Sequence, residues 1–484
     1  MLGALILTVG VRLYLFMNYY TINNDGVLYI EAARHFWAGQ WIEGLASFYP
    51  PGFPLMIALV YPLVGDWELA GQFWPFLLGF FTLLPLFLLL RRVYGSRVAQ
   101  DALLFYAVSP YLARFSLHVR SEMPYIFFLV LALYLLQRGM DGRYWLSFFW
   151  MGVSAAMAYL IRSEGFGLFM VAALFLFYRG WYQGHLKEKA APIASLTVGF
   201  VLLALPYVLY LRHDTGNWLI SRKAAFIVSL GLAEHDLNSE EIEAKESDRV
   251  NVVGLISSHP LGYAKKVFLD LFRSLGVYLE ALHYSYLPFL FLGWFYFFRG
   301  RFCEKKDFLF LAAVLFYLAA FSLLYVNRRY AVPLVPLSLG WVAVGYRAME
   351  RYFSARFGRR GAFLIVVVVV LFLIGTLPKT LQAIGKEKLY LREAGVYLRG
   401  KAKRSKVITT NARVAFYAEG RNVILVGQAG EIPALLETAG KAYIALDEAV
   451  FKRVKGSLVQ DWIVDKEFSD GPGETLMVFT SRAD

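Results

Sequence analysis

The sequence has one cysteine, Cys303, and few charged residues for a chain of 484 residues. A single cysteine excludes a disulfide framework within the chain, a cysteine-based zinc site and an iron–sulfur cluster. Charged residues make up 18% of the chain and hydrophobic residues 58%. A globular domain has roughly 25% charged and about 45–50% apolar residues. The composition therefore excludes a soluble globular protein, a disordered chain, collagen and a coiled coil.

Long apolar segments recur through residues 1–378, so a single cleavable signal peptide would explain only the first of them. About eleven of these segments approach the ~20 residues that a membrane span requires. The predicted spans are 2–18, 68–90, 97–112, 123–138, 145–161, 164–178, 192–211, 284–298, 307–325, 331–347 and 362–378. The predicted fold class is mainly α, a polytopic membrane helix bundle.

The composition changes near residue 380, after which charged residues and glycine interrupt every apolar run. We therefore predict a membrane domain over 1–378 and a small soluble α/β domain over 379–484. Within the second, a helix is expected at 386–400, with strands near 406–409, 422–426 and 442–446, and a closing strand pair at 462–468 and 476–479. This domain carries no catalytic motif, and acceptor recognition or a lid is the hypothesis for its role.

Basic residues in the short loops predict the orientation, because cytoplasmic loops are enriched in Lys and Arg. One set of loops carries Arg91, Arg92, Arg97, Arg138, Arg143, Arg179, Lys187, Lys189, Arg299, Arg301, Lys305, Lys306, Arg347, Arg351, Arg356, Arg359 and Arg360. The opposite short loops carry only Arg114, Arg120, Arg162, Arg328 and Arg329. The first set is therefore predicted to be cytoplasmic. Loops 19–67 and 212–283 and the C-terminal domain then lie on the periplasmic or extracytoplasmic side of an inner (plasma) membrane. The net charge of +13 indicates contact with anionic membrane lipids rather than with nucleic acid.

The first outer loop is too polar at its start, and too interrupted by Pro50, Pro51 and Pro54, to span the membrane. Residues 25–38 are expected to form an amphipathic helix in the membrane interface, ended by Gly39. Its apolar stripe consists of Tyr29, Ala33, Phe36 and Trp37. Asn23-Asn24-Asp25-Gly26 lies at the start of this helix. Either Asn24 or Asp25 is the N-cap, or Asp25 is a carboxylate held at the membrane surface as a general base.

Three further polar clusters interrupt apolar sequence on the same predicted side. Glu122 precedes the fourth span, and a carboxylate there is costly unless it is paired or used. It is either ion-paired with Arg120, a cap on the following helix, or functional. The other two clusters are Arg162-Ser163-Glu164-Gly165 and Asn327-Arg328-Arg329-Tyr330. Four polar clusters on one face of an apolar bundle, counting the one at Asp25, predict a single site.

These motifs carry a resemblance to a known superfamily. Asn24-Asp25-Gly26 with its amphipathic helix, followed by Tyr49-Pro50-Pro51-Gly52, is similar to the first outer loop of bacterial GT-C glycosyltransferases. Ser121-Glu122-Met123-Pro124, Arg162-Ser163-Glu164-Gly165 and Arg329-Tyr330 follow the same pattern, and the resemblance covers residues 1–347. The chain resembles the branch that contains protein O-mannosyltransferases and the lipid A aminoarabinose transferase. The resemblance implies transfer of a sugar from a polyprenyl phosphate to an acceptor on the non-cytoplasmic face.

The sequence departs from both relatives at defined positions. Aminoarabinose transferases place a Glu-Lys pair immediately before their Pro-Pro, whereas this chain has Phe48-Tyr49. Protein mannosyltransferases tend to follow the first-loop Asp with Glu, whereas Gly26 follows here, and loop 212–283 is too short for their β-trefoil insert. The acceptor, whether glycan, lipid or protein, therefore stays open.

A lipid-phosphate sugar already carries a good leaving group. The enzyme must therefore deprotonate an acceptor hydroxyl and stabilise the departing phosphate. Asp25 is the candidate base, with Glu122 assisting it or orienting the acceptor, and direct displacement would invert the anomeric centre. Guanidinium groups suit phosphate geometry. The candidate phosphate and substrate residues are Arg120, Arg162, Glu164, Arg328, Arg329 and Tyr330. In loop 212–283, Arg222 and Lys223 either reach a phosphate or contact solvent and lipid headgroups.

No cofactor is predicted, although a divalent metal is not excluded by the sequence. The seven histidines show no HExxH or HxH spacing, and Glu234-His235-Asp236 is either a ligand trio or a solvated charge run. No nucleotide-binding glycine motif occurs, which argues against a nucleotide sugar as direct donor. The competing class is a membrane transporter or a lipid-linked sugar flippase. Such proteins usually contain internal repeats with polar residues near mid-membrane, whereas this chain shows no repeat and its charges cluster on one face.

Overall fold

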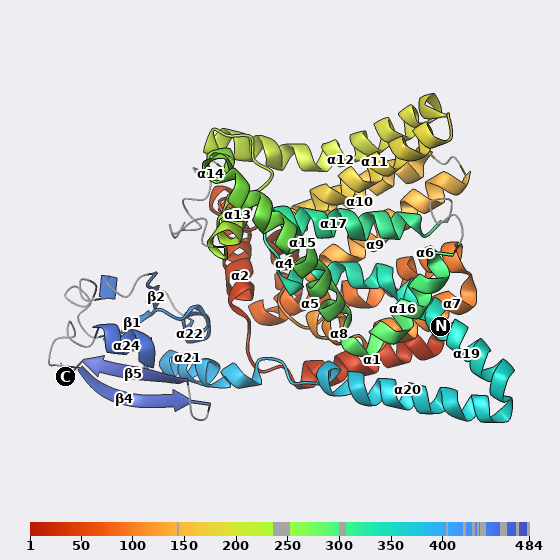
Figure 1. Cartoon of the computed structure of the whole chain (residues 1–484). Helices are drawn as coiled ribbons and strands as arrows, with labels where there is room; N and C mark the ends of the chain where they lie inside the picture. The colour runs from red at the N-terminus through yellow and green to blue at the C-terminus, as the bar shows by residue number, and fades with distance from the viewer. Residues whose placement is uncertain are drawn as a thin grey trace. The chain divides into compact units, whose positions relative to one another are not determined.

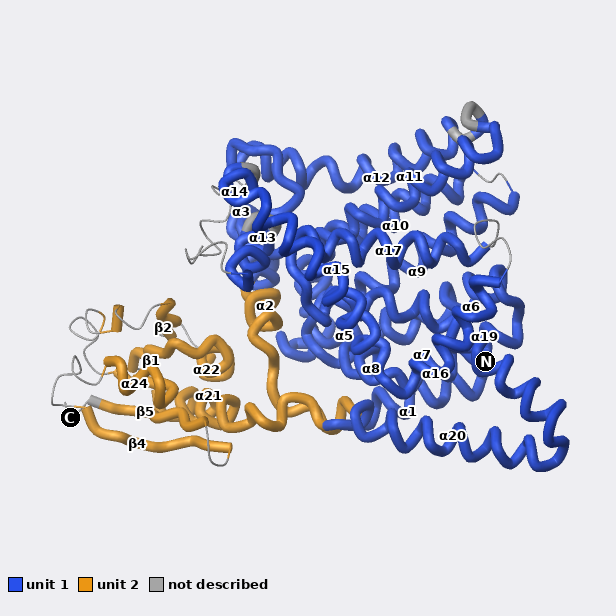
Figure 2. Tube along the Cα trace, viewed as in Figure 1, with its two compact units in different colours: residues 1–14, 32–382 blue, residues 15–31, 383–484 orange. Residues whose placement is uncertain are grey.

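The computed structural model describes most of the chain. The described residues are 1–142, 145–235, 252–299, 306–402, 405–419, 423–427, 431–432, 435, 442–454, 462–470 and 474–481. They form two compact units, which Figure 2 colours separately. Unit 1 consists of residues 1–14 and 32–382, and unit 2 consists of residues 15–31 and 383–484.

Unit 1 is built from helices, and Figure 1 shows α9, α10, α11 and α12 among them. Its helices are α3 (Trp41–Leu45), α4 (Gly52–Val64), α5 (Trp67–Phe81), α6 (Leu83–Tyr94), α7 (Ser96–Val108), α8 (Pro110–Phe115), α9 (Glu122–Gly142), α10 (Trp145–Ile161), α11 (Gly165–Tyr182), α12 (Leu186–Thr215), α13 (Lys223–Ala233), α14 (Val252–Ser258), α15 (Pro260–Leu282), η2 (Tyr284–Tyr286), α16 (Leu287–Phe297), α17 (Phe308–Leu323), α18 (Arg328–Ala331), η4 (Val332–Leu334), α19 (Val335–Phe357) and α20 (Arg359–Thr380). Helices α1 (Leu2–Met17) and α2 (Asn24–Trp37) contribute to both units.

Six helical segments in the described part of the chain are long and apolar enough to cross a membrane. They are Trp67–Tyr94, Glu122–Gly142, Gly165–Tyr182, Ala190–Thr215, Arg328–Phe357 and Arg359–Thr380. Four shorter apolar helices are Leu2–Met17, Gly52–Val64, Trp145–Ile161 and Phe308–Leu323. Every span predicted from the sequence coincides with helical structure. The chain is a multi-pass membrane protein.

Segment 52–64 differs from the expectation that prolines would interrupt it. It forms the apolar helix α4 of 13 residues. Pro54 lies in the first turn of α4, where a missing backbone N–H leaves no intrahelical hydrogen bond unmade. The helix is nevertheless shorter than the ~20 residues of a full span.

Close backbone contact between α10 and α12 depends on a small residue. A Cβ atom at Gly199 would lie 2.2 Å from the carbonyl oxygen of Phe149, which is too close for any other residue without a shift. Small residues at helix contacts are typical of membrane bundles, because close packing there replaces the hydrophobic effect as the driving force. This contact fixes α10, whose end leads into the Arg162 cluster, against its neighbour.

Unit 2 contains a five-stranded sheet with the order β2-β1-β3-β5-β4. Its elements are η5 (Lys386–Lys388), α21 (Leu389–Lys401), β1 (Lys406–Thr409), α22 (Ala412–Ala418), β2 (Val423–Leu425), β3 (Ala442–Asp447), α24 (Glu448–Val454), β4 (Trp462–Ser469) and β5 (Thr475–Ser481). Strand β1 pairs in parallel with β2 and β3, and β5 pairs antiparallel with β3 and β4. The predicted small α/β fold at the C-terminus is confirmed, including its closing strand pair.

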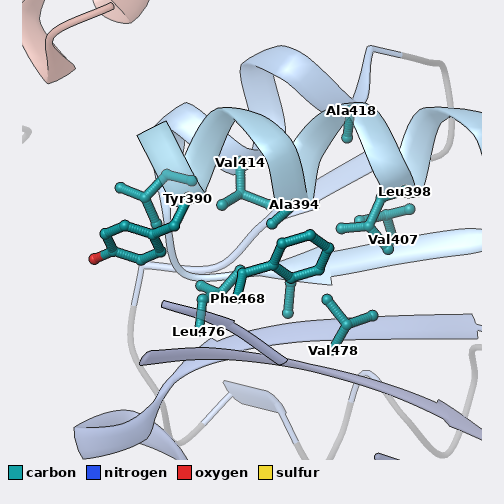
Figure 3. Close-up of a cluster of buried hydrophobic side chains, with 11 residues drawn as sticks. Tyr390, Ala394, Leu398, Val407, Val414, Ala418, Phe468, Leu476 and Val478 are labelled. Carbon is teal, nitrogen blue, oxygen red and sulfur yellow. The ribbon is translucent and has the colours of Figure 1, made fainter. Parts of the chain in front are cut away.

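Successive side chains of β1 point to opposite faces of this sheet. Val407 packs in a cluster with Leu398 of α21 and Val414 of α22, and Figure 3 shows these side chains on one face. Ile408, the next residue, packs with Ile444 in a separate cluster. Both faces are therefore covered, as the apolar run Val407-Ile408 requires.

Residues 15–31 join unit 2 through backbone pairing with the segment that leaves α20. Tyr20 donates its N–H to Ile384 (2.9 Å), and Ile384 donates its own to Asn18 (2.9 Å). The N–H of Ile22 donates to the hydroxyl of Tyr417 (2.8 Å). A boundary drawn from composition near residue 380 does not assign this N-terminal segment to the C-terminal unit.

Candidate active site

Glu122 begins helix α9, one residue after the buried Ser121, and its side chain is fully buried. Arg329 donates to its Oε1 from Nε (3.1 Å) and Nη2 (2.9 Å). Arg162 places Nη1 3.1 Å from the same oxygen. The sequence left open an ion pair between Glu122 and Arg120. The structure brings two arginines that are distant in sequence to Glu122.

Arg162 lies at the break between α10 and α11, and only 5% of its side chain is exposed. A Cβ at Gly165 would lie 2.1 Å from the backbone nitrogen of Tyr159, so the tight turn after Arg162 requires glycine. Besides Glu122, Arg162 donates to Oε1 of Glu164 (2.7 Å). The guanidinium group thus joins two carboxylates from different parts of the chain.

Arg329 and Tyr330 lie on the short helix α18. The side-chain oxygen of Asn327 caps this helix by accepting from the N–H of Arg329 (3.0 Å). The ring centroid of Tyr330 lies 5.5 Å from the guanidinium carbon of Arg162. Three polar clusters that are separate in the sequence, at Glu122, Arg162 and Arg329, therefore meet in unit 1.

Two other predicted arginines contact aromatic rings. Arg328 forms an ion pair with Glu280 of α15, and both side chains are exposed by about half. Its guanidinium carbon lies 4.9 Å from the ring centroid of Tyr111. Arg120 lies over the ring of Phe115, at 5.6 Å. Adjacent arginines on α18 thus diverge, because consecutive helical residues do not share a face.

Asp25 belongs to unit 2 and lies in the first turn of α2. The helix begins at Asn24, and the carbonyl of Asn23 accepts from the N–H of Val27 (3.3 Å), which makes Asn23 the capping residue. Asp25 thus lies inside the first turn of α2. Asp25 is half-buried, at a helix position where the helix dipole favours a carboxylate.

The predicted apolar stripe of this helix is correct except at one residue. Tyr29, Ala33 and Phe36 are buried, whereas Trp37 is 53% exposed. Trp37 is the last residue of α2 and contacts the edge of Tyr61 at 5.7 Å between ring centroids.

An apolar cavity of about 300 Å³ borders the charged cluster. Helices α11, α13 and α17 and the residues next to them supply most of its wall. The apolar lining residues are Phe166, Gly167, Met170, Ile220, Ile227, Phe316, Ala320, Phe321 and Leu324. The polar lining residues are Ser163, Glu164, Lys223, Tyr317, Tyr325 and Tyr330. Sequence reasoning did not select the phenylalanines of this wall or most of its tyrosines, because aromatic residues make up 17% of the chain and carry no positional signal.

Comparisons with known proteins agree with this architecture. Residues 49–210 match the family described as dolichyl-phosphate-mannose-protein mannosyltransferase. ArnT from Cupriavidus metallidurans, in a crystal structure bound to undecaprenyl phosphate, is similar with a TM-score of 0.64 and 12% identity over 99% of this chain and 97% of that one. The archaeal oligosaccharyltransferase AglB from Archaeoglobus fulgidus, in complex with an inhibitory peptide and a dolichol-phosphate, is similar with a TM-score of 0.57 and 11% identity. That match covers 92% of this chain and 69% of the AglB chain. No curated protein sequence matches the chain.

The chain has the GT-C fold. The resemblance to GT-C glycosyltransferases that the motifs predicted is thereby confirmed. The match extends beyond the residues that carried the resemblance, because it includes the C-terminal unit.

Within this GT-C chain, charge rather than burial determines the ionisation of Glu164. Burial alone would raise the pKa of Glu164, but the positive charges of Arg162 and Lys223 outweigh it and hold that pKa below its ordinary value. The Glu164 carboxylate is therefore ionised at neutral pH, and it holds one side of the Arg162 guanidinium group. Tyr317 supports the same turn by donating its hydroxyl to the carbonyl of Glu164 (3.0 Å).

Within the described residues, no group of three or more His, Cys, Asp or Glu side chains could hold a metal ion. Two members of the trio considered from the sequence have side-chain partners in the fold. Glu234 pairs with Arg273 (2.5 Å), and His235 pairs with Asp270 (3.1 Å). The third member, Asp236, lies outside the described residues.

Proposed function

We propose that the protein is a glycosyltransferase that moves a sugar from a polyprenyl phosphate to an acceptor on the outer face of the membrane. The observation that carries this proposal is the cluster of Glu122, Arg162 and Arg329 beside an apolar cavity in a GT-C fold. A lipid-linked donor needs both parts, an apolar space for its isoprenoid units and fixed cations for its phosphate. Two structures of this fold support the donor class, since one is bound to undecaprenyl phosphate and the other is in complex with a dolichol-phosphate.

On the donor side, Arg162 and Arg329 would contact the phosphate that leaves. Donors fixed before the reaction stabilise developing charge best, because no reorganisation is needed at the moment of bond breaking. Glu122 would supply this fixation, since its Oε1 holds both guanidinium groups at 2.9–3.1 Å. We therefore assign Glu122 the role of positioning the two arginines, with Glu164 holding Arg162 from the other side.

On the acceptor side, Asp25 would act as the general base. The acceptor hydroxyl oxygen attacks the anomeric carbon and its proton passes to Asp25. The bond between that carbon and the phosphate oxygen breaks, and polyprenyl phosphate leaves with the bonding electrons. This direct displacement inverts the anomeric centre. Asp25 lies in the first turn of α2, where the helix dipole favours the negatively charged form of a carboxylate.

The basic loops support an outer-face site, and the C-terminal unit is the candidate for recognising the acceptor. That acceptor is a glycan, a lipid or a protein, and the reaction as proposed uses no cofactor. Mass spectrometry of envelope glycans and lipids from a deletion strain would identify the missing modification. A strain that loses no glycoconjugate while accumulating lipid-linked sugar on the cytoplasmic leaflet would favour a flippase instead.

The decisive experiment measures release of polyprenyl phosphate from synthetic polyprenyl-phosphate sugars by purified protein in lipid nanodiscs. Asp25→Asn should reduce turnover by about 10²–10⁴-fold, the usual effect of losing a general base. Donor binding and thermal stability should remain near wild type. Asp66→Asn is the matched control, because Asp66 is exposed and its capping bond to Leu69 can be made equally well by Asn. An Asp25→Asn enzyme with wild-type turnover would remove Asp25 from the mechanism.

The arginine assignments are tested in the same assay. Arg162→Ala and Arg329→Ala should each raise the donor KM by roughly 10- to 150-fold, because each removes charge-assisted hydrogen bonds to phosphate. Arg328→Ala should have a small effect, since Arg328 pairs with the exposed Glu280. A large effect of Arg328→Ala together with none from Arg329→Ala would reverse the assignment within α18.

A further inference from the structure

The cavity beside the charged cluster contains a cation that the roles above do not use. Lys223 is the first residue of α13 and lines the cavity wall. Its Nζ lies 5.1 Å from the ring centroid of Tyr49 and 5.4 Å from that of Tyr330. Contacts of this kind with aromatic rings hold an ammonium group in place at an otherwise apolar surface. The end of a long, flexible side chain is thereby localised.

The charge balance of the cavity makes Lys223 significant. Among the described residues of its wall, Glu164 and Lys223 are the two that carry a charge. Glu164 is paired with Arg162 at 2.7 Å, and the Arg162 guanidinium is shared with Glu122. Lys223, whose charge also acts on Glu164, is therefore the cation that the wall itself contributes.

We propose that Lys223 binds the phosphate of the lipid-linked donor, and that Tyr49 and Tyr330 hold its ammonium group in place for this purpose. This inference rests on the proposed function and adds the outer helix α13 to the donor site. An ammonium group acts on phosphate as a compact point charge. It complements the planar guanidinium groups of Arg162 and Arg329.

Lys223 approaches the first outer loop at the point where the sequence departs from a relative. The chain has Phe48-Tyr49 before Pro50-Pro51, where aminoarabinose transferases carry a Glu-Lys pair, so this part of the first outer loop lacks a lysine. The structure brings a lysine from another loop against the ring of Tyr49.

The test measures binding of a fluorescent polyprenyl monophosphate to the full-length protein in nanodiscs of zwitterionic phosphatidylcholine. Lys223→Gln should weaken binding by roughly 10-fold or more, because a charge-assisted contact to phosphate is lost. Lys223→Arg, which keeps the charge, should restore most of the affinity. Lys265→Gln is the matched control, since Lys265 is an exposed lysine in the same outer segment. Equal affinities of wild type and Lys223→Gln would overturn the proposal.

A second variant tests the role of the aromatic rings independently. Tyr49→Leu should weaken binding by about 2- to 5-fold, the range expected for one cation–π contact. In the Lys223→Gln background the same change should have no further effect. An unchanged effect of Tyr49→Leu in that background would show that Tyr49 acts without Lys223 and would overturn its assigned role.

Two further outcomes distinguish a failure of the proposed function from a failure of the Lys223 assignment. If the wild-type protein does not bind polyprenyl monophosphate, the proposed function fails. If the wild type binds it and Lys223→Gln changes only the response to added phosphatidylglycerol, Lys223 contacts bulk lipid headgroups and the inference alone fails. Kinetically, Lys223→Gln should raise the KM for the donor.

Discussion

Replacing Glu122 with Gln tests whether one buried carboxylate holds the two arginines of the site. Three contacts converge on its Oε1, two from Arg329 (3.1 and 2.9 Å) and one from Arg162 (3.1 Å). A hydrogen bond that involves a charged group contributes about 1.5–3 kcal/mol, so the two from Arg329 contribute roughly 3–6 kcal/mol if they add, apart from the ion pair with Arg162. Charge-assisted bonds are roughly twice as strong as neutral ones, and Gln keeps an acceptor oxygen in the same place. About half of that sum, roughly 1.5–3 kcal/mol, should therefore be lost, together with the attraction between Glu122 and Arg162.

This loss agrees with the roughly 3–5 kcal/mol that removing one partner of a buried ion pair costs. It is a large share of the about 5–15 kcal/mol that stabilises a typical protein, so the variant should fold but unfold more easily. The assay is denaturant unfolding in detergent micelles, compared with turnover of the lipid-phosphate sugar. Donor KM should rise as well, because Arg329 loses its fixed position.

Glu280→Gln is the matched control for this prediction. It also breaks a Glu–Arg pair, with Arg328, but that pair is exposed and should contribute no more than about 1 kcal/mol. If Glu122→Gln proves as stable as Glu280→Gln, the buried carboxylate does not hold the arginines by charge. If instead turnover falls while stability and donor KM stay at wild-type values, Glu122 acts in the chemical step and not by positioning.

Three further predictions concern topology, pH and the outer segment. A cysteine at the exposed Ser469 should react with a membrane-impermeant thiol reagent in intact spheroplasts, whereas native Cys303 should react only after the membrane is opened; the opposite order would place the site on the cytoplasmic side. The pKa of Glu164 in the folded protein lies below its ordinary value of 4.5. The ionised Glu164 side chain therefore contributes its full stabilisation at pH values above 4.5, and this stabilisation is lost as the pH falls through the lowered pKa. Glu164→Gln should therefore lower the melting temperature at pH 7, and its difference from wild type should shrink below pH 4.5; a difference that is constant with pH would contradict this. Lys266 is 1% exposed and donates to two carbonyl oxygens at the end of α17 (2.9 and 2.8 Å). Lys266→Met should therefore lower the unfolding free energy by about 3–5 kcal/mol in denaturant titrations, and the exposed Lys265→Met should not.

The helical segments of the membrane unit follow from the sequence, because each apolar run has to satisfy its backbone hydrogen bonds internally in lipid. That requirement is local, so a run such as 362–378 predicts helix α20 without knowledge of its neighbours. The alternation of strands and helices in the C-terminal unit can likewise be predicted from local sequence. A short β-branched run such as that within Lys406–Thr409, followed by a helix, is enough to predict a strand of a small α/β fold.

The sequence also predicted which polar residues would gather. Glu122, Arg162 and Arg329 each interrupt apolar sequence, and an ionisable residue in such a place must find a partner. The identity of that partner was beyond sequence reasoning. Arg329, more than two hundred positions away, donates to Glu122. Helix geometry determines this choice, since it directs Arg328 and Arg329 to different carboxylates.

The cavity and the assignment of residues 15–31 to unit 2 were decided by the tertiary structure alone. Each aromatic residue of the cavity wall is unremarkable among the 41 phenylalanines and 31 tyrosines of the chain. Only the packing of α11, α13 and α17 leaves a space between them, and only that packing puts Lys223 beside Tyr49. Local sequence determines where a helix begins and which of its faces is apolar. The contacts between helices depend on close packing of many side chains at once, and this is why the partners of Glu122 and the surroundings of Lys223 emerge only in the folded chain.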